Sequence, residues 1–295
     1  MNIAGGFIAA SLAPSTRRIY AQAVEQLRDF AVTMFPGSSW FPTSVPLLCT
    51  FVAHLLSTGL APTSVTSRMS AIAFFHKLFH LHDPTGDFFV RRLLLGAYKQ
   101  LGTFDVRFPI SLSILHQLFA SSGHVTQSAY SSCLLRAMYL LMFHAFLRIG
   151  EVTKSRNNLL FSQVSILSDS LVIVFQQAKH QYGSHISISV PRSRTSFCPV
   201  AALSAYFSLR GPSSGPLFCE PDLSPITPHR FNTWLSLSLM WASLHHLPIK
   251  SHSFRIGAAT HASAQGYSDS QIQRMGRWKS TAFKRYIRIS SFVTF

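Results

Sequence analysis

Apolar side chains in the first hundred residues recur every three or four positions, which is the spacing of an amphipathic helix. Proline and glycine interrupt this pattern at intervals, and such interruptions are typical of helix ends. The pattern predicts four helices, over residues 15–35, 45–59, 63–81 and 87–101. Helices of this length with short connections form a small bundle, and we place its end within residues 102–108.

The pattern beyond this point is mixed. Two β-rich runs lie on either side of Gly183-Ser184 and predict a hairpin within residues 170–191. Further helices are predicted after Pro199 and over residues 111–121, 129–147, 230–247, 253–265 and 268–276. We therefore expect a mainly α fold with a small β-hairpin or sheet. A chain of 295 residues is long enough for two domains, a helical one over residues 1–105 and an α+β one over residues 106–295.

The charge balance adds a class of partner. The chain has 26 Lys and Arg against 10 Asp and Glu, a formal net charge of +16. Such a surface attracts polyanions, so the sequence favours nucleic acid over an anionic membrane surface. The N-terminal apolar run follows no Lys or Arg, and no stretch of about 18 apolar residues occurs, so neither secretion nor a membrane span is predicted. The four cysteines are far apart and indicate a reducing compartment without a disulfide framework or metal site.

Several residues of the second half could carry chemistry, and each has an ordinary alternative. Arg148 near a helix end could complement the helix dipole, and Lys179 beside the hairpin turn could be a solvated charge. His252 and Arg255, three residues apart, could be a surface pair. Tyr286 could pack its ring within a helix. Taken singly, none of these residues predicts a function.

Their order along the chain is more specific. An arginine at a helix end, a lysine on a hairpin, His-x-x-Arg opening a helix, then Gly-Arg-Trp and a tyrosine near the C-terminus resemble the tyrosine recombinase family of DNA strand-exchange enzymes. The likeness covers most of the chain: the helical N-terminal region resembles the SAM-like core-binding domain, and the rest resembles the catalytic domain. Gly-Arg-Trp-Lys-Ser at 276–280 and His-Asp-Pro-Thr at 82–85 resemble recombinases of eukaryotic DIRS-like or Crypton-type mobile elements. That origin implies the nucleus; otherwise the cytoplasm or nucleoid is expected.

The resemblance implies a role for each residue. Arg148 and Arg255 would bind the scissile phosphate in place of metal ions, since a guanidinium matches phosphate oxygens. Tyr286 would attack the phosphorus and form a 3′-phosphotyrosine. Lys179 would protonate the 5′ leaving oxygen, and His252 would share in proton transfer or bond the phosphate. Glu151 would orient one of these cationic groups. No metal or other cofactor is implied.

Two positions depart from the family pattern. The family usually has His or Trp directly after the glycine, at a fixed distance before the tyrosine, whereas Arg277 follows Gly276 here. The spacing to Tyr286 selects Arg277 for this position, and the spacing from Arg255 favours Trp278. We choose Trp278 as the residue that contacts the phosphate. The nine residues after Tyr286 are too few for the long C-terminal helix that many members dock onto a neighbouring subunit.

Three functions are weighed. The first is a site-specific DNA recombinase or integrase. The resemblance implies that it acts as a homotetramer on two double-stranded DNA sites. The second is a catalytically inactive DNA-binding protein that retains the fold, and the third is a type IB topoisomerase. The remaining candidates for DNA binding in the first domain are Arg17, Arg18, Arg68 and Lys77. Phosphate contact and a solvated helix face are equal interpretations of these residues. We add Arg277 of the second domain as a further candidate for DNA binding.

Overall fold

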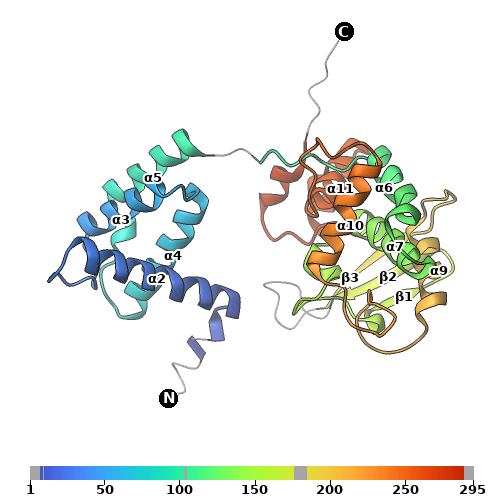
Figure 1. The fold of residues 1–295 in the computed structure, drawn as a ribbon, viewed down its shortest axis with the longest axis horizontal. Helices are drawn as coiled ribbons and strands as arrows, with labels where there is room; N and C mark the ends of the chain where they lie inside the picture. The colour runs from blue at the N-terminus through green and yellow to red at the C-terminus, as the bar shows by residue number, and fades with distance from the viewer. Residues whose placement is uncertain (1–6, 9, 103–104, 176–184, 289–295) are drawn as a thin grey trace, which may run out of the picture. The chain divides into compact units, whose positions relative to one another are not determined.

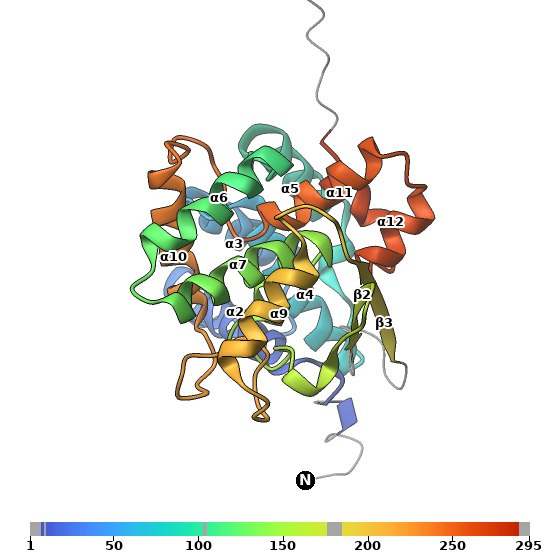
Figure 2. The same cartoon turned by 90° about the vertical axis from the view of Figure 1, so that its right-hand side faces the viewer.

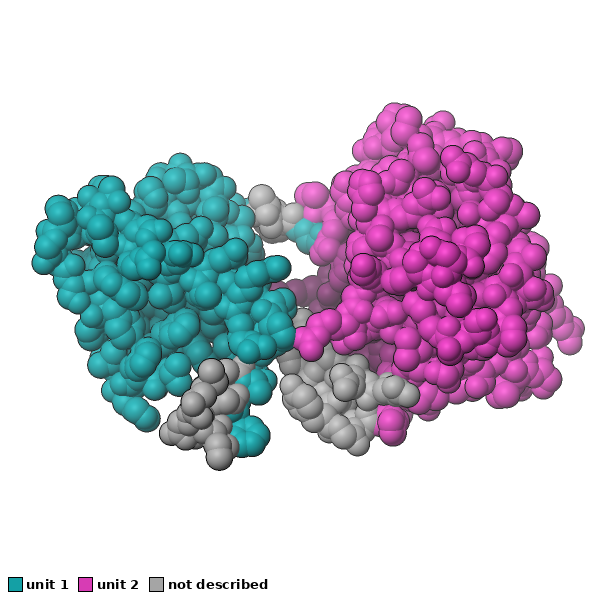
Figure 3. Space-filling view, turned by 60° about the horizontal axis from the view of Figure 1, so that its bottom comes forward, with its two compact units in different colours: residues 1–105 teal, residues 106–295 magenta. Residues whose placement is uncertain are grey.

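The chain folds into two compact units, residues 1–105 and 106–295 (Figure 3). The computed structural model describes residues 7–8, 10–102, 105–175 and 185–288. Most of these residues are helical, and the strands form one small antiparallel sheet, which confirms the predicted fold class (Figure 1). Within the described ranges, no helix is long and apolar enough to cross a membrane.

The first unit contains the four predicted helices. They are α2 (Pro14–Met34), α3 (Val45–Ser57), α4 (Pro62–Leu78) and α5 (Phe88–Leu101). Proline lies in the first turn of α2, α3 and α4, where its missing N–H breaks no helical hydrogen bond. Helix α2, which was expected to begin at Ser15, begins one residue earlier, at Pro14. The apolar faces meet in one core that includes Leu27, Leu48, Phe51, Val65 and Ile72.

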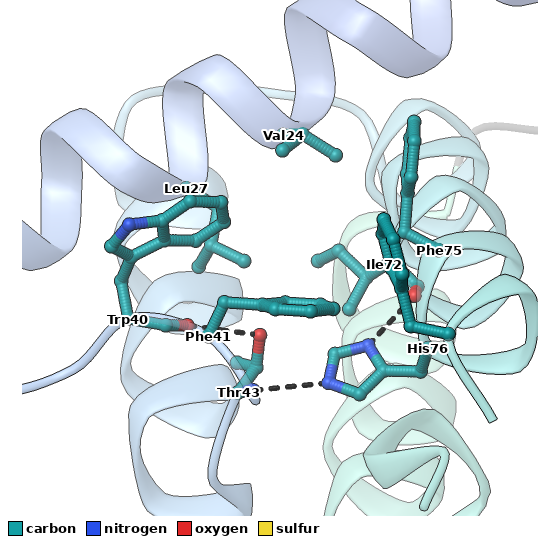
Figure 4. A pocket seen from close by; sticks show the side chains of 9 residues that line it. Val24, Leu27, Trp40, Phe41, Thr43, Ile72, Phe75 and His76 are labelled. Atoms are coloured by element: carbon teal, nitrogen blue, oxygen red, sulfur yellow. Dashed lines mark hydrogen bonds between the residues drawn. The ribbon is translucent and has the colours of Figure 1, made fainter. Parts of the chain in front are cut away.

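An apolar pocket of about 210 Å³ lies in this unit (Figure 4). At its wall the buried His76 accepts a hydrogen bond at Nε2 from the backbone N–H of Thr43 (3.0 Å) and donates from Nδ1 to the carbonyl of Ile72 (2.8 Å). The two bonds use both ring nitrogens, so His76 joins α4 to the segment before α3. This histidine is a structural residue of the bundle.

The second unit is organised around a buried helix. Helix α7 (Ala129–His144) packs against α6 (Leu112–Val125), α9 (Pro199–Arg210) and α11 (Ser253–Ala264) (Figure 2). Almost every side chain in its second half is buried, as expected for a helix that is apolar on all faces. Helices α10 (Pro228–Trp241) and α12 (Asp269–Met275) complete the set. The predicted capping box of α12 is confirmed, with Ser268 and Gln271 bonded to each other's backbone N–H.

The sheet has the order β1-β2-β3, all antiparallel. Strands β2 (Ser170–Phe175) and β3 (Ile186–Pro191) are the predicted pair, and β1 (Val164–Ile166) is an additional strand of three residues. Alternate side chains of β2 are buried, as its period of two predicts. The expected turn at Gly183-Ser184 and Lys179 lie outside the described residues.

Helix α7 ends three residues earlier than the expected Leu147. Phe146 takes a left-handed backbone (φ +52°), and the N–H of Leu147 bonds the carbonyl of Met142 (3.0 Å), which closes the helix. Residues 145–147 remain buried after the helix has ended, so the apolar pattern continues through the turn. Arg148 therefore does not end α7 but precedes the short helix α8 (Ile149–Val152).

An extended segment at the start of the second unit crosses helix α11 in close contact. The N–H of Ile110 bonds the carbonyl of Ser253 (3.2 Å), and the N–H of Phe108 bonds that of Pro248 (3.1 Å). Gly257 lies under this crossing: a Cβ there would stand 1.9 Å from the carbonyl oxygen of Ile110. Only glycine lets the two backbones approach so closely.

We expect Gly257→Ala to destabilise the second unit by about 3 kcal/mol or more, because the methyl group would meet rigid backbone atoms rather than a movable side chain. Thermal unfolding of the full chain measures the effect. The control is Gly96→Ala in α5, where a Cβ meets nothing within 4 Å; it should stabilise the first unit by about 0.5 to 1 kcal/mol. An unchanged unfolding temperature for Gly257→Ala would contradict the crossing.

Candidate active site

The first turn of α11 carries Arg255 into the interior. The residue is 1% exposed. Nη1 donates to the backbone carbonyl of Phe146 and Nη2 to that of Gly276, while Nε has no hydrogen-bond partner in the described part of the chain. Burial, together with the nearby positive charges of Arg148 and Arg277, lowers the pKa of Arg255 to about 9. The guanidinium is thus a fixed, charged fork in a site that holds several cations.

Arg148 and Glu151 form the next part of the site, at the start of α8. The carboxylate of Glu151 bonds back to the backbone N–H of Arg148 (Oε2, 2.7 Å), which is the bond a glutamate makes at the third position of a helix. Its other oxygen accepts from Nη1 of Arg148 (3.2 Å). The side chain of Arg148 is 36% exposed, so this arginine is accessible from solvent whereas Arg255 is not.

Arg277 approaches the same carboxylate from the loop after α12. Its Nη2 lies 2.8 Å from Oε2 of Glu151, and its Nη1 donates to the carbonyl of Ala145 (3.2 Å). The side chain is 2% exposed, and burial lowers the pKa of Arg277 while the Glu151 carboxylate opposes that shift. Glu151 is therefore held between two arginines.

Trp278 and Tyr286 complete the cluster. The Trp278 ring covers the guanidinium of Arg255, 4.1 Å from the ring centre. The ring of Tyr286 lies 5.2 Å from that of Trp278 and 5.0 Å from that of His252, which directly precedes α11. All of these groups therefore belong to one continuous set of contacts.

Local structure fixes the position of Tyr286. It is the last residue of the 3₁₀ segment η3 (Thr281–Tyr286), which is anchored by the buried ring of Phe283. On α11 the hydroxyl of Thr260 donates to the carbonyl of Tyr286 (3.1 Å) and accepts from the N–H of Arg288 (3.0 Å). Helix α11 thus positions both Arg255 and the backbone of Tyr286.

The structure brings most of the predicted residues together. Seven of them form the cluster: Arg148, Glu151, His252, Arg255, Arg277, Trp278 and Tyr286. Lys179 lies outside the described residues. The four candidates for phosphate contact are in the first unit: Arg17 and Arg18 are exposed on α2, Arg68 bonds Gln26 (2.7 Å), and Lys77 pairs with Asp83 (3.1 Å).

Three contributors to the site were not predicted. The carbonyl groups of Phe146 and Gly276 bind Arg255, and backbone acceptors leave no side-chain signature in a sequence. Thr260 lies five residues after Arg255 and has no motif of its own. Among the contacts described above, Glu151 contributes the acidic side chain of the cluster. The described residues contain no group of three or more His, Cys, Asp or Glu that could hold a metal ion.

No protein-family model matches the sequence, and no curated protein matches it. Solved structures do match the fold. XerH site-specific recombinase bound to palindromic difH substrate, a post-cleavage complex, has a TM-score of 0.69 at 12% identity, over 93% of this chain and 76% of that one. A lambda integrase dimer bound to a COC′ core site gives 0.62 at 14%, over 95% and 74%. The Tn1549 transposon integrase (residues 82–397) with circular intermediate DNA gives 0.63 at 13%, over 94% and 96%. The chain therefore has the tyrosine recombinase fold.

Proposed function

We propose that this protein is a tyrosine-type DNA recombinase or integrase that cleaves and rejoins DNA through a covalent 3′-phosphotyrosine. One observation carries the proposal: the Tyr286 ring lies against His252 and against Trp278, which covers the Arg255 guanidinium. A nucleophile, a proton-transferring group and a phosphate-binding cation are the parts that phosphodiester cleavage requires.

In the proposed reaction the hydroxyl oxygen of Tyr286 attacks the scissile phosphorus. A bond from that oxygen to phosphorus forms, the bond from phosphorus to the 5′ oxygen breaks, and the leaving oxygen takes a proton from Lys179. The energy of the phosphodiester is kept in the phosphotyrosine, so a 5′-hydroxyl of a second strand can reverse the step and release Tyr286. His252, beside the tyrosine ring, accepts or relays the proton of the attacking hydroxyl.

The arginines stabilise the charge that develops on the non-bridging oxygens. Arg148 offers an accessible guanidinium, and Arg255 offers one whose direction is fixed by two backbone carbonyls. Once DNA binding has uncovered the Arg255 guanidinium, donors held in this way need little further rearrangement as the transition state forms. Arginine supplies here the charge that divalent cations supply in other nucleases, so the proposal includes no metal or other cofactor.

The proposed partner is double-stranded DNA, bound by a homotetramer at paired sites. The net charge of +16 supports this partner, and the three matching structures described above are complexes with DNA. We propose that the first unit binds the duplex and uses Arg17, Arg18, Arg68 and Lys77 on phosphates. An origin in a DIRS-like or Crypton-type element, and with it a nuclear location, is part of the same proposal.

A specific observation favours the second candidate, a DNA-binding protein that keeps the fold without catalysis. Arg255 is almost completely buried, and both of its Nη atoms are bonded to protein carbonyls. In an inactive protein this arrangement would persist on DNA, and Arg255 would have only a structural role. In an active recombinase, substrate binding must uncover the guanidinium.

Covalent trapping separates the two candidates. The full chain is incubated with a pool of nicked duplexes, denatured and digested, and the peptides are searched for a tyrosine-linked nucleotide. We expect an adduct on the peptide that contains Tyr286, and sequencing the attached DNA defines a cleavable duplex. Salt-sensitive DNA binding without any adduct would overturn the recombinase proposal in favour of the inactive protein.

A further inference from the structure

Arg277 occupies a backbone position that is unfavourable for its residue type. The N–H of Trp278 bonds the carbonyl of Gln273 (2.9 Å) and that of Arg277 bonds the carbonyl of Arg274 (3.0 Å), which is the hydrogen-bond pattern of a Schellman motif at the end of α12. The residue at this point is left-handed, and Arg277 has φ +55°. Glycine is the usual residue there, yet the glycine of this sequence is one position earlier. The side chain of Arg277 must therefore offset a backbone cost.

The Arg277 side chain is surrounded by other groups of the protein. Nη2 contacts Oε2 of Glu151 (2.8 Å) and the carbonyl of Phe146 (3.4 Å), and the guanidinium lies over the ring of Phe175, 4.1 Å from its centre. With 2% of the side chain exposed, Arg277 has almost no surface to present to DNA. A buried charge is stable in such a place only when it is paired and hydrogen-bonded, as it is here.

The groups that Arg277 contacts are those that fix the two other arginines. The carbonyl oxygen of Phe146 accepts from both Arg255 and Arg277. The carboxylate of Glu151 accepts from both Arg148 and Arg277. Without Arg277, the Glu151 carboxylate would pair with Arg148 alone. Its negative charge would then neutralise more of the positive charge that Arg148 offers to a phosphate.

We propose that Arg277 is a positioning residue for phosphodiester cleavage: it binds Glu151 and the Phe146 carbonyl, and through them it holds Arg148 and Arg255 in place. The inference rests on the proposed recombinase function. It assigns Arg277 to the support of the site rather than to contact with DNA. Trp278 remains the residue proposed to face the phosphate.

The test uses the duplex recovered by covalent trapping. Arg277→Gly removes the side chain and leaves the residue that the left-handed backbone prefers, which offsets part of the cost of breaking the buried pair with Glu151. A thermal unfolding curve shows that the variant is folded at the assay temperature. We expect single-turnover cleavage at saturating DNA to fall about 10- to 100-fold, the usual effect of removing a group that orients a catalytic one. Arg277→Lys, which keeps the charge but not the planar fork, should restore part of that loss.

DNA binding separates positioning from direct contact. A side chain that contacts a phosphate contributes about 1 to the slope of log affinity against log salt concentration. We expect Arg277→Gly to leave both the affinity and this slope unchanged. The control is Arg274→Ala, which removes an exposed arginine from the last turn of the same helix without the helix cost of glycine and should leave the cleavage rate at the wild-type value.

A double substitution tests the path through Glu151. If Arg277 acts through this carboxylate, the effects of the two substitutions should not add. Arg277→Gly should then lower the cleavage rate of the Glu151→Gln protein much less than it lowers the rate of the wild-type protein. Full cleavage by Arg277→Gly, or a slope reduced by about 1, would overturn the inference while the adduct of the wild-type protein still supports the recombinase. Failure of the wild-type protein to form an adduct would instead overturn the proposed function.

Discussion

Tyr286→Phe is expected to abolish the covalent DNA adduct and to leave DNA affinity nearly unchanged. The substitution removes one oxygen, the proposed nucleophile, and keeps the ring that packs against His252 and Trp278. No other group in the cluster can form a phosphotyrosine, so the loss should be complete rather than partial. Denaturing gels of the trapped complex and equilibrium binding to the same labelled duplex measure the two effects.

The matched control for this variant is Tyr267→Phe. Tyr267 lies between α11 and α12 and is 46% exposed. The Tyr267→Phe protein should therefore form the Tyr286 adduct at the wild-type rate. An adduct that persists in Tyr286→Phe would assign the nucleophile to another residue. Loss of DNA binding in the same variant would show that Tyr286 supports the fold or the DNA interface instead.

Arg255→Lys is expected to lower the cleavage rate about 100- to 1000-fold, the effect of losing one preorganised donor set at a developing oxyanion. Lysine keeps the positive charge and the apolar stem, but its single nitrogen cannot replace the two Nη atoms that bond the carbonyls of Phe146 and Gly276. We choose lysine because alanine would remove the Arg255 donor from the buried carbonyl of Gly276, would leave the Phe146 carbonyl with Arg277 alone, and would thus also destabilise the unit. Single-turnover cleavage of the recovered duplex measures the change.

Arg274→Lys is the control for this substitution, since Arg274 is exposed in the same unit and outside the cluster. Its rate should equal that of the wild-type protein. If Arg255→Lys also cleaves at the wild-type rate, Arg255 has a structural role only, and the phosphate charge must be stabilised by Arg148 and other groups. A thermal unfolding curve for each variant shows whether the fold is retained.

The sequence predicted the helices well where local chemistry marks their ends. Proline in the first turn, glycine after the last, and the Ser268–Gln271 capping box are local features, and all three kinds are present in the structure. The prediction failed at the end of α7 because burial continued past the helix and hid the turn at Phe146. Strand β1 was missed because three residues are too few for a periodic pattern.

Seven side chains of the candidate site could be named from the sequence, whereas Lys179 lies outside the described residues and the backbone partners could not be named. The order of residue types selected the seven side chains that the structure places in contact. Their partners could not be found in the same way, since the two carbonyls that bind Arg255 are 109 and 21 residues away along the chain. The spacing also left Arg277 and Trp278 as alternatives for one position. In the structure they occupy different places, one bonded to Glu151 and the other over Arg255.

The crossing of residues 108–110 over α11 sets the limit for isolating the second unit. Ile110 bonds the first turn of the helix that carries Arg255, and its backbone covers Gly257. A fragment that begins at Val106 keeps this segment. One that begins at Leu112, the first residue of α6, lacks it and exposes a glycine in the middle of a core helix. A truncation chosen only from helix boundaries would thus remove part of the support of the candidate active site.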